Sequence, residues 1–181
     1  MAHTFDQHYW DDHWTEAAGH APAEPNPALV EEAAKLAPGR ALDAGCGHGT
    51  EAIWLSGQGW QVTAVDISEQ ALQQARKRSD AVGWLCADLL EWSPPQQFDL
   101  VATHYVHAAG PLFARLAQWV APGGTLLVVG HHHGEHPPEA TLTIDDIGLP
   151  AGEWTVATAR NRTRSTPGGK LHDTIFCARK G

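Results

Sequence analysis

The chain has 181 residues, of which 43% are hydrophobic and 18% charged, and a formal net charge of -9; this composition is typical of one globular domain. The acidic balance argues against a nucleic-acid partner, because phosphate binding needs clustered Lys and Arg. No apolar run approaches the roughly 20 residues of a membrane span, and the polar N-terminus does not resemble a secretory signal. The three widely spaced cysteines favour neither a disulfide framework nor a zinc knuckle. We therefore expect a cytoplasmic protein without a membrane partner.

Strand and helix signals alternate along the chain from residue 26 onward. Asn26 followed by Pro27 is a typical helix start and predicts a helix over residues 28–36. Short apolar or β-branched runs predict strands over residues 40–44, 61–66, 82–86, 98–103 and 125–129. Helices are predicted between them, over residues 50–56, after the N-cap Ser68 and over residues 112–120. These repeated strand–helix units predict a parallel sheet with right-handed crossovers.

The last part of the chain has a different pattern. Residues 154–162 and 171–178 are two predicted strands around a turn at residues 167–169, which indicates a hairpin instead of another crossover. The expected fold class is therefore α/β. It is a doubly wound, Rossmann-like and mostly parallel seven-stranded sheet with an antiparallel C-terminal hairpin strand.

Charge is distributed unevenly between the two ends of the chain. Residues 1–34 hold seven acids and no Lys or Arg, whereas residues 151–181 hold six basic residues. Three of these, Arg160, Arg162 and Arg164, alternate along a predicted strand and therefore share one face. That face is expected to be a solvated edge, or to contact an anionic substrate or the acidic N-terminal segment.

The richest motif is the loop over residues 42–50, which has the sequence LDAGCGHGT and joins a predicted strand to a predicted helix. Glycines there let the backbone turn sharply and let a ligand approach closely. Gly45, Gly47 and Gly49 give the spacing G-x-G-x-G, which differs from the dinucleotide fingerprint G-x-G-x-x-G. Asp43 would repel a pyrophosphate, and its carboxylate instead suits a ligand that carries a cationic amine.

Two further acids follow the next predicted strands. Asp66 lies 23 residues after Asp43, at the end of the second strand, where a carboxylate can accept hydrogen bonds from a ribose diol. Asp88 follows the third strand at the same edge of the sheet.

In these motifs the chain resembles the class I S-adenosylmethionine-dependent methyltransferases, over residues 28–130 and with the tail hairpin also fitting. The segments FDLV at residues 98–101 and APGG at residues 121–124 resemble the family's fourth-strand motif and the turn before its fifth strand. Residues 42–68 look most similar to small stand-alone enzymes of the tellurite-resistance and thiopurine kind.

The resemblance implies S-adenosyl-L-methionine as the cofactor. In the family the glycine loop holds the amino-acid end, the acid after the second strand holds the ribose hydroxyls, and the acid after the third strand meets the adenine amino group. The implied cofactor-binding residues are Asp43, Gly45, Cys46, Gly47, Gly49, Asp66, Ile67, Ala87, Asp88, Leu89, Thr103 and His104.

Six of the twelve histidines fall in residues 104–107 and 131–136, which follow the fourth and fifth predicted strands. Ligands of open α/β sheets bind outside the carboxyl ends of the strands, so we expect these histidines to flank the methyl acceptor. His104 and His107 are the favoured general bases or orienting groups.

The N-terminal segment, residues 1–25, corresponds to a lid in the family, and residues 26–181 to the methyltransferase domain. Aromatic side chains on such a lid shield the site from water. His13 and Tyr9 of this segment are therefore further catalytic candidates.

The strand-end histidines have two other interpretations. They are surface residues of loops, or they hold a divalent transition metal, because neutral imidazoles are common ligands of such metals. The candidate metal ligands are His104, His107, His131 and His133.

The expected function is methyl transfer to a small-molecule acceptor, because the chain is little larger than the cofactor-binding core and is acidic. A thiol, an imidazole or other nitrogen heterocycle, or a metalloid fits this expectation. One alternative is an enzyme that uses the same cofactor and a His-bound metal to hold the acceptor. Another is a module that binds the cofactor or a metal without turnover. The chain is expected to be a monomer or a homodimer.

Overall fold

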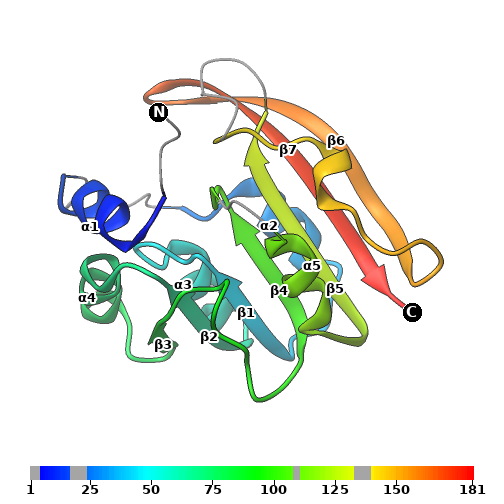
Figure 1. Ribbon diagram of the computed structural model, residues 1–181, viewed down its shortest axis with the longest axis horizontal. Helices are drawn as coiled ribbons and strands as arrows, with labels where there is room; N and C mark the ends of the chain where they lie inside the picture. The colour runs from blue at the N-terminus through cyan, green and yellow to red at the C-terminus, as the bar shows by residue number, and fades with distance from the viewer. Residues whose placement is uncertain (1–4, 17–23, 108–110, 133–139) are drawn as a thin grey trace.

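A central sheet of seven strands organises the computed structural model, which describes residues 5–16, 24–107, 111–132 and 140–181 (Figure 1). The strand order is β3-β2-β1-β4-β5-β7-β6. The five strands from β3 to β5 are parallel, and β7 is antiparallel to both of its neighbours. The predicted fold class is confirmed. The strands are β1 (Arg40–Ala44), β2 (Gln61–Asp66), β3 (Gly83–Cys86), β4 (Phe98–His104), β5 (Val120–His131), β6 (Trp154–Thr166) and β7 (Gly169–Lys180).

Helices cover both faces of this sheet. One face packs against α2 (Pro27–Ala33), α3 (Thr50–Gly57) and α4 (Glu69–Arg78). The other packs against α5 (Leu112–Gln118), which lies in front of the sheet in Figure 1, and the 3-10 turn η2 (Ile144–Ile147). Neighbouring strand residues such as Ala41 and Leu42 belong to opposite layers, because successive side chains of a strand point to opposite faces. Of the described helices, none is long and apolar enough to cross a membrane.

Several element ends differ from the predicted ones. The helix α2 stops at Ala33, because the next turn tightens into bonds from Lys35 N and Leu36 N to carbonyls three residues earlier. The predicted helix over residues 112–120 ends at Gln118, because Val120 pairs with Phe98 and opens β5. The strands β5, β6 and β7 are all longer than their sequence signals, because pairing with a neighbour extends a strand beyond its locally apolar part.

The described part of the N-terminal segment contains a helix, α1 (Gln7–Glu16), beside α4 (Figure 1). Asp11 Oδ1 accepts a hydrogen bond of 2.6 Å from Ser68 Oγ, and Gln74 Nε2 donates one of 3.5 Å to Trp14 O. None of the residues of α1 is fully buried. The helix therefore rests on the domain by one face, and the division into a lid and a domain stays a prediction.

Ion pairs join the C-terminal hairpin to α2. Glu31 accepts hydrogen bonds of 2.7 Å from Arg160 Nη2 and from Arg162 Nη1. The bond from Arg162 is the largest influence on Glu31 and lowers the pKa of its carboxyl. Arg160 and Arg162 therefore contact an acid of the N-terminal region, which was one of the alternatives for this face. Because all three side chains are partly exposed, solvent screens these pairs.

Ser68 is the N-cap of α4, as predicted, and its hydroxyl accepts a bond of 3.2 Å from Ala71 N while it donates to Asp11. We expect Ser68→Ala to lower the free energy of unfolding by about 1 kcal/mol, because the first turn loses its cap. Urea denaturation measures this. Ser56→Ala is the matched control, since that hydroxyl makes only a 3.5 Å bond to Ala81 O. Equal losses in both variants would contradict a capping role.

Candidate active site at the carboxyl edge of the sheet

The glycine loop connects β1 to α3 and lies against β2. Gly45 N and Cys46 N donate to Val65 O over 2.8 and 3.0 Å. Gly45 and Gly47 have φ angles of 78° and 50°, a region that favours glycine. A Cβ on Gly45 would overlap Val106 Cγ2, and one on Gly47 would lie 2.7 Å from Trp14 Cζ2. The loop therefore needs glycine for both its conformation and its close neighbours.

Asp66 binds this loop from the end of β2. Its side chain is almost fully buried, and its carboxylate accepts bonds from Gly47 N over 2.7 Å and from Ser68 N over 2.9 Å. Burial raises the pKa of Asp66, and these two bonds act in the opposite direction. The acid therefore holds the glycine loop and the N-terminus of α4 together.

Two buried polar atoms at adjacent strand ends lack partners. Asp43 and Thr103 are each 1% exposed, and within the described part of the chain Asp43 Oδ2 and Thr103 Oγ1 have no hydrogen-bond partner. Burial raises the pKa of Asp43, and the carboxylates of Glu51 and Asp66 raise it further. An unpaired buried carboxylate is costly unless a cation joins it. Asp43 Oδ2 therefore fits a ligand with a cationic amine, such as the amino-acid end of S-adenosylmethionine. Thr103 points to the opposite face of the sheet, because Asp43 is in register with Ala102 and Thr103 with Ala44.

Most of the remaining implied cofactor residues lie after β2 and β3, whereas Cys46 belongs to the glycine loop. Ala87 N donates to Asp66 O over 2.9 Å, which brings the residues after β2 and β3 side by side. Asp88 Oδ1 accepts from Leu90 N over 2.8 Å. Cys46 is 6% exposed, and burial raises its pKa, so it is a small apolar filler of the loop. Ile67 follows β2, and Leu89 follows β3 next to Asp88.

Aromatic side chains of α1, and of Phe5 just before it, contact both the glycine loop and His107. The Trp14 ring lies 4.4 Å from that of His48 in the glycine loop. At the other end, the rings of Phe5 and Trp10 lie 4.9 and 5.4 Å from that of His107. The two predicted catalytic residues of this segment differ in exposure, since Tyr9 is half-buried and His13 is exposed.

A cavity of about 320 Å³ opens at the ends of β4 and β5. Polar side chains from both strands line it together with apolar ones, and His107 and His131 lie with their ring centroids 5.8 Å apart. The lining residues with polar or aromatic side chains include Thr103, Tyr105, His107, Phe113, His131 and Asp146.

His104 lies apart from this cavity. It is absent from the described residues that line it, and both of its ring nitrogens are buried without a partner among the described residues. Burial lowers its pKa, while the carboxylates of Glu51 and Asp173 act in the opposite direction. Successive strand residues face opposite sides, so His104 faces away from the side to which Thr103 points. Of the expected strand-end histidines, His107 and His131 therefore line the cavity and His104 does not, and the catalytic and cofactor-binding roles of His104 stay predictions.

The metal hypothesis gains no support. The residues that the structure describes include no group of three or more His, Cys, Asp and Glu side chains able to hold an ion. The candidate ligand His133 lies outside the described residues. His132 turns away from the cavity and lies 3.2 Å from Thr174 Oγ1 and 3.4 Å from Asn161 Nδ2.

Three residues with contacts at the site were missed by the sequence analysis: Phe5 beside His107, Asp11 beside Ser68, and Tyr105 beside His131. Helical spacing was an available signal for Asp11, because Asp11 and Trp14 are three residues apart and share a face of α1. The contacts of Phe5 and Tyr105 have no counterpart in local sequence.

The sheet order, the glycine loop and the acids at the ends of β1 and β2 are those of the class I S-adenosylmethionine-dependent methyltransferases, and comparisons with known proteins support this class. Residues 41–124 match the family model described as a methyltransferase domain.

Relatives with assigned names agree with this class. The chain is 32% identical over 127 residues to a trans-aconitate 2-methyltransferase of Acidovorax sp. (strain JS42), covering 67% of this chain and 49% of that protein. It therefore spans about half the length of that relative. It is 26% identical over 180 residues to the probable thiol methyltransferase 2 of Arabidopsis thaliana, covering 87% of this chain and 79% of that protein.

A solved structure shares the fold. The Burkholderia thailandensis 1,6-didemethyltoxoflavin-N1-methyltransferase, with bound 1,6-didemethyltoxoflavin and S-adenosylhomocysteine, superposes with a TM-score of 0.66 at 23% identity. The match covers 96% of this chain and 83% of that chain.

Proposed function

We propose that this protein transfers the methyl group of S-adenosylmethionine to a small-molecule acceptor. The observation that carries the proposal is the buried Oδ2 of Asp43, which has no partner among the described residues and lies beside the left-handed glycine loop, at the same sheet edge as the cavity. Asp43 would hold the cofactor's amine, the glycine loop would lie against the rest of its amino-acid end, and Asp66 would accept from its ribose hydroxyls. Asp88 would meet the adenine.

Charge at the cavity favours a weakly charged acceptor. No Lys or Arg is among the described residues that line it, and residues 1–4, 17–23, 108–110 and 133–139 contain none either. A tricarboxylate such as trans-aconitate would therefore enter without a strong cationic partner. A thiol needs none, and the relative named as a thiol methyltransferase aligns over most of both chains. We therefore propose a small thiol as the acceptor.

The side chains of this protein would need only to align the acceptor and to remove its proton. S-adenosylmethionine supplies a methyl group that is already activated on a sulfonium, so alignment for in-line displacement is the main requirement. Neutral His107 would accept the thiol proton as the sulfur attacks. The rings of Phe5 and Trp10 next to His107 would exclude water.

Titration calorimetry with S-adenosylhomocysteine and an assay of S-adenosylhomocysteine formation test this function. We expect binding, and turnover with benzenethiol above a buffer control and above trans-aconitate. Absence of binding would overturn the cofactor site. Faster turnover of trans-aconitate would overturn the thiol assignment. Binding without product across thiols, nitrogen heterocycles and carboxylates would favour the non-catalytic binding module.

His107→Asn tests the role of the imidazole. We expect kcat with benzenethiol to fall by about 100-fold or more, because the proton acceptor is lost, while the affinity for S-adenosylhomocysteine stays unchanged. His8→Asn is the control, because that side chain is 87% exposed and its ion pair among the described residues is with Asp12 of the same helix. Equal losses of turnover and of cofactor affinity in His107→Asn would contradict an acceptor-side role.

A further inference from the structure

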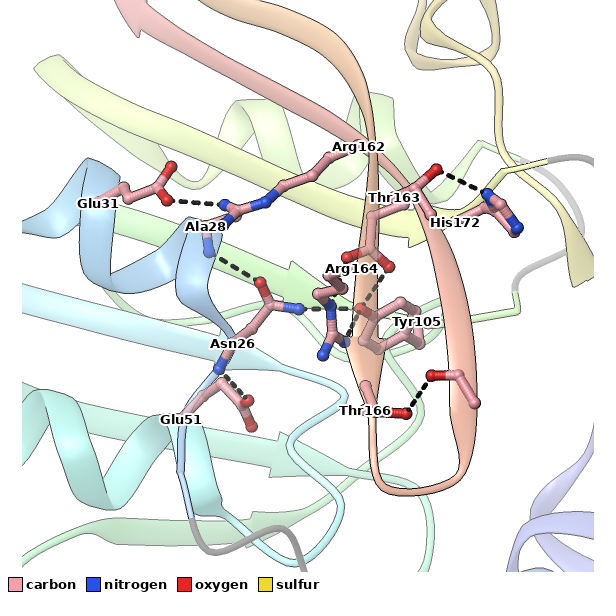
Figure 2. A network of polar contacts seen from close by, with 12 residues as sticks. Asn26, Ala28, Glu31, Glu51, Tyr105, Arg162, Thr163, Arg164, Thr166 and His172 are labelled. Carbon is pink, nitrogen blue, oxygen red and sulfur yellow. Dashed lines mark hydrogen bonds and ion pairs between the residues drawn. The ribbon is translucent and has the colours of Figure 1, made fainter.

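The hydroxyl of Tyr105 joins three segments that are distant in sequence (Figure 2). It donates to Asp173 Oδ1 of β7 over 2.7 Å. It accepts from Asn26 Nδ2, just before α2, over 2.9 Å, and from Arg164 Nη2 of β6 over 2.8 Å. Arg164 Nε also donates to Asp173 Oδ2 over 2.7 Å. We call these four residues, Asn26, Tyr105, Arg164 and Asp173, the tyrosine network.

The network is partly buried, and the hydroxyl of Tyr105 at its centre makes three hydrogen bonds. Asp173 is 1% exposed, and the Arg164 side chain is 21% exposed. Burial and the carboxylate of Asp173 raise the pKa of Tyr105, so the phenol keeps its proton and remains a donor. Fully satisfied buried networks rigidify what they contact. The position of the phenol is therefore set from three sides.

The backbone at Tyr105 is strained. Its φ is 55°, and within the described part of the chain it is the non-glycine residue with a left-handed backbone. A bulky residue adopts this conformation only where its surroundings over-determine it. Tyr105 N also donates to Val129 O over 2.8 Å, which ties the turn to β5. The tyrosine network therefore supplies the constraint that holds this turn.

The turn at Tyr105 contacts the candidate active site in two ways, through the ring of Tyr105 and through the residues that follow it in the chain. The Tyr105 ring stacks on the His131 ring with centroids 4.5 Å apart and planes 29° apart. Along the chain, Val106 packs against Gly45 of the glycine loop, and His107 lines the cavity. Rotation of the Tyr105 ring or relaxation of its backbone would displace both imidazoles.

We infer that Tyr105 is a positioning residue through which the C-terminal hairpin holds His131 and His107 at the acceptor cavity. Arg164 and Asp173 fix the phenol, the phenol fixes the turn after β4, and the turn orients the two rings. This inference rests on the proposed function for its catalytic consequence. Its structural core, the orientation of His131, is measurable without an acceptor.

The test compares Tyr105→Phe with Arg164→Gln, and uses Arg162→Gln as the control from the same strand. Arg162 pairs with Glu31 and lies outside the tyrosine network. Imidazole NMR signals of His131, assigned from their loss in His131→Gln, report its environment. Calorimetry with S-adenosylhomocysteine and kcat with benzenethiol report cofactor binding and turnover. Tyr105→Phe retains the bond between Arg164 and Asp173. It therefore tests whether the Tyr105 hydroxyl positions His131 even if Arg164→Gln does not fold.

We expect Tyr105→Phe and Arg164→Gln to shift the His131 signals and to lower kcat by about 10-fold or more, with cofactor affinity unchanged. Arg162→Gln should match the parent in all three measurements. Parent-like His131 signals in Tyr105→Phe would overturn the inference, as would an equal loss of cofactor affinity and kcat. If the parent does not turn over benzenethiol, the proposed acceptor fails, and the NMR comparison still decides the positioning role.

Discussion

Replacing Gly45 with alanine is expected to lower the free energy of unfolding by about 3 kcal/mol and to abolish cofactor binding. Two costs add. The φ of 78° is unfavourable for alanine, and the new methyl group would overlap Val106 Cγ2. Relief of that overlap must displace the glycine loop or the turn that carries His107. Urea denaturation and calorimetry with S-adenosylhomocysteine measure the two effects.

Gly152→Ala separates the two costs. Gly152 has a φ of 86°, with no heavy atom within 4 Å of an added Cβ, so this variant should lose only about 1 kcal/mol for its backbone. The double variant Gly45→Ala/Val106→Ala should recover part of the Gly45 loss by making room. An equal loss at Gly45 and Gly152 would show that the contact with Val106 has no energetic consequence.

Asp43→Asn is expected to weaken the binding of S-adenosylhomocysteine by about 10-fold or more, because a charge-assisted bond to the amine becomes a neutral one. The same change should stabilise the free protein by about 1 kcal/mol at neutral pH, because it removes a buried charge. Weaker binding together with higher stability would indicate a carboxylate kept for function. A carboxylate that stabilises the fold would instead lower the stability when it is replaced.

The pH dependence follows from the raised pKa of Asp43. A group whose pKa is higher in the folded state stabilises the fold most below its unfolded pKa, and this contribution is lost as the pH rises through the folded pKa. Asparagine does not ionise. The stability gain of Asp43→Asn should therefore be small near pH 3.8, the ordinary pKa of an aspartate, and grow towards neutral pH. Thermal melting across this range measures it, with the exposed Asp80→Asn as the control. Lower stability of Asp43→Asn at neutral pH would contradict the prediction.

Local sequence determined most of the fold, because the signals act over a few residues. The bounds of β1 and β2 match their predictions, and Asn26 and Ser68 cap α2 and α4 as expected. Apolar periodicity, helix caps and glycine spacing each depend on neighbours in the chain. The glycine loop and the acids after the strands were recognisable for the same reason, and their binding roles stay predictions.

The tertiary structure alone decided which side chains meet. The sequence placed the histidines of residues 104–107 and 131–136 around one acceptor. The strand pleat and the left-handed Tyr105 bring His107 to His131 at the cavity and leave His104 apart. The tyrosine network draws residues from before α2, after β4 and from β6 and β7. Such contacts depend on strand order and register, which local sequence patterns do not encode. The sequence by itself therefore determined the fold class and the motifs that resemble a cofactor site, and packing decided which side chains line the cavity.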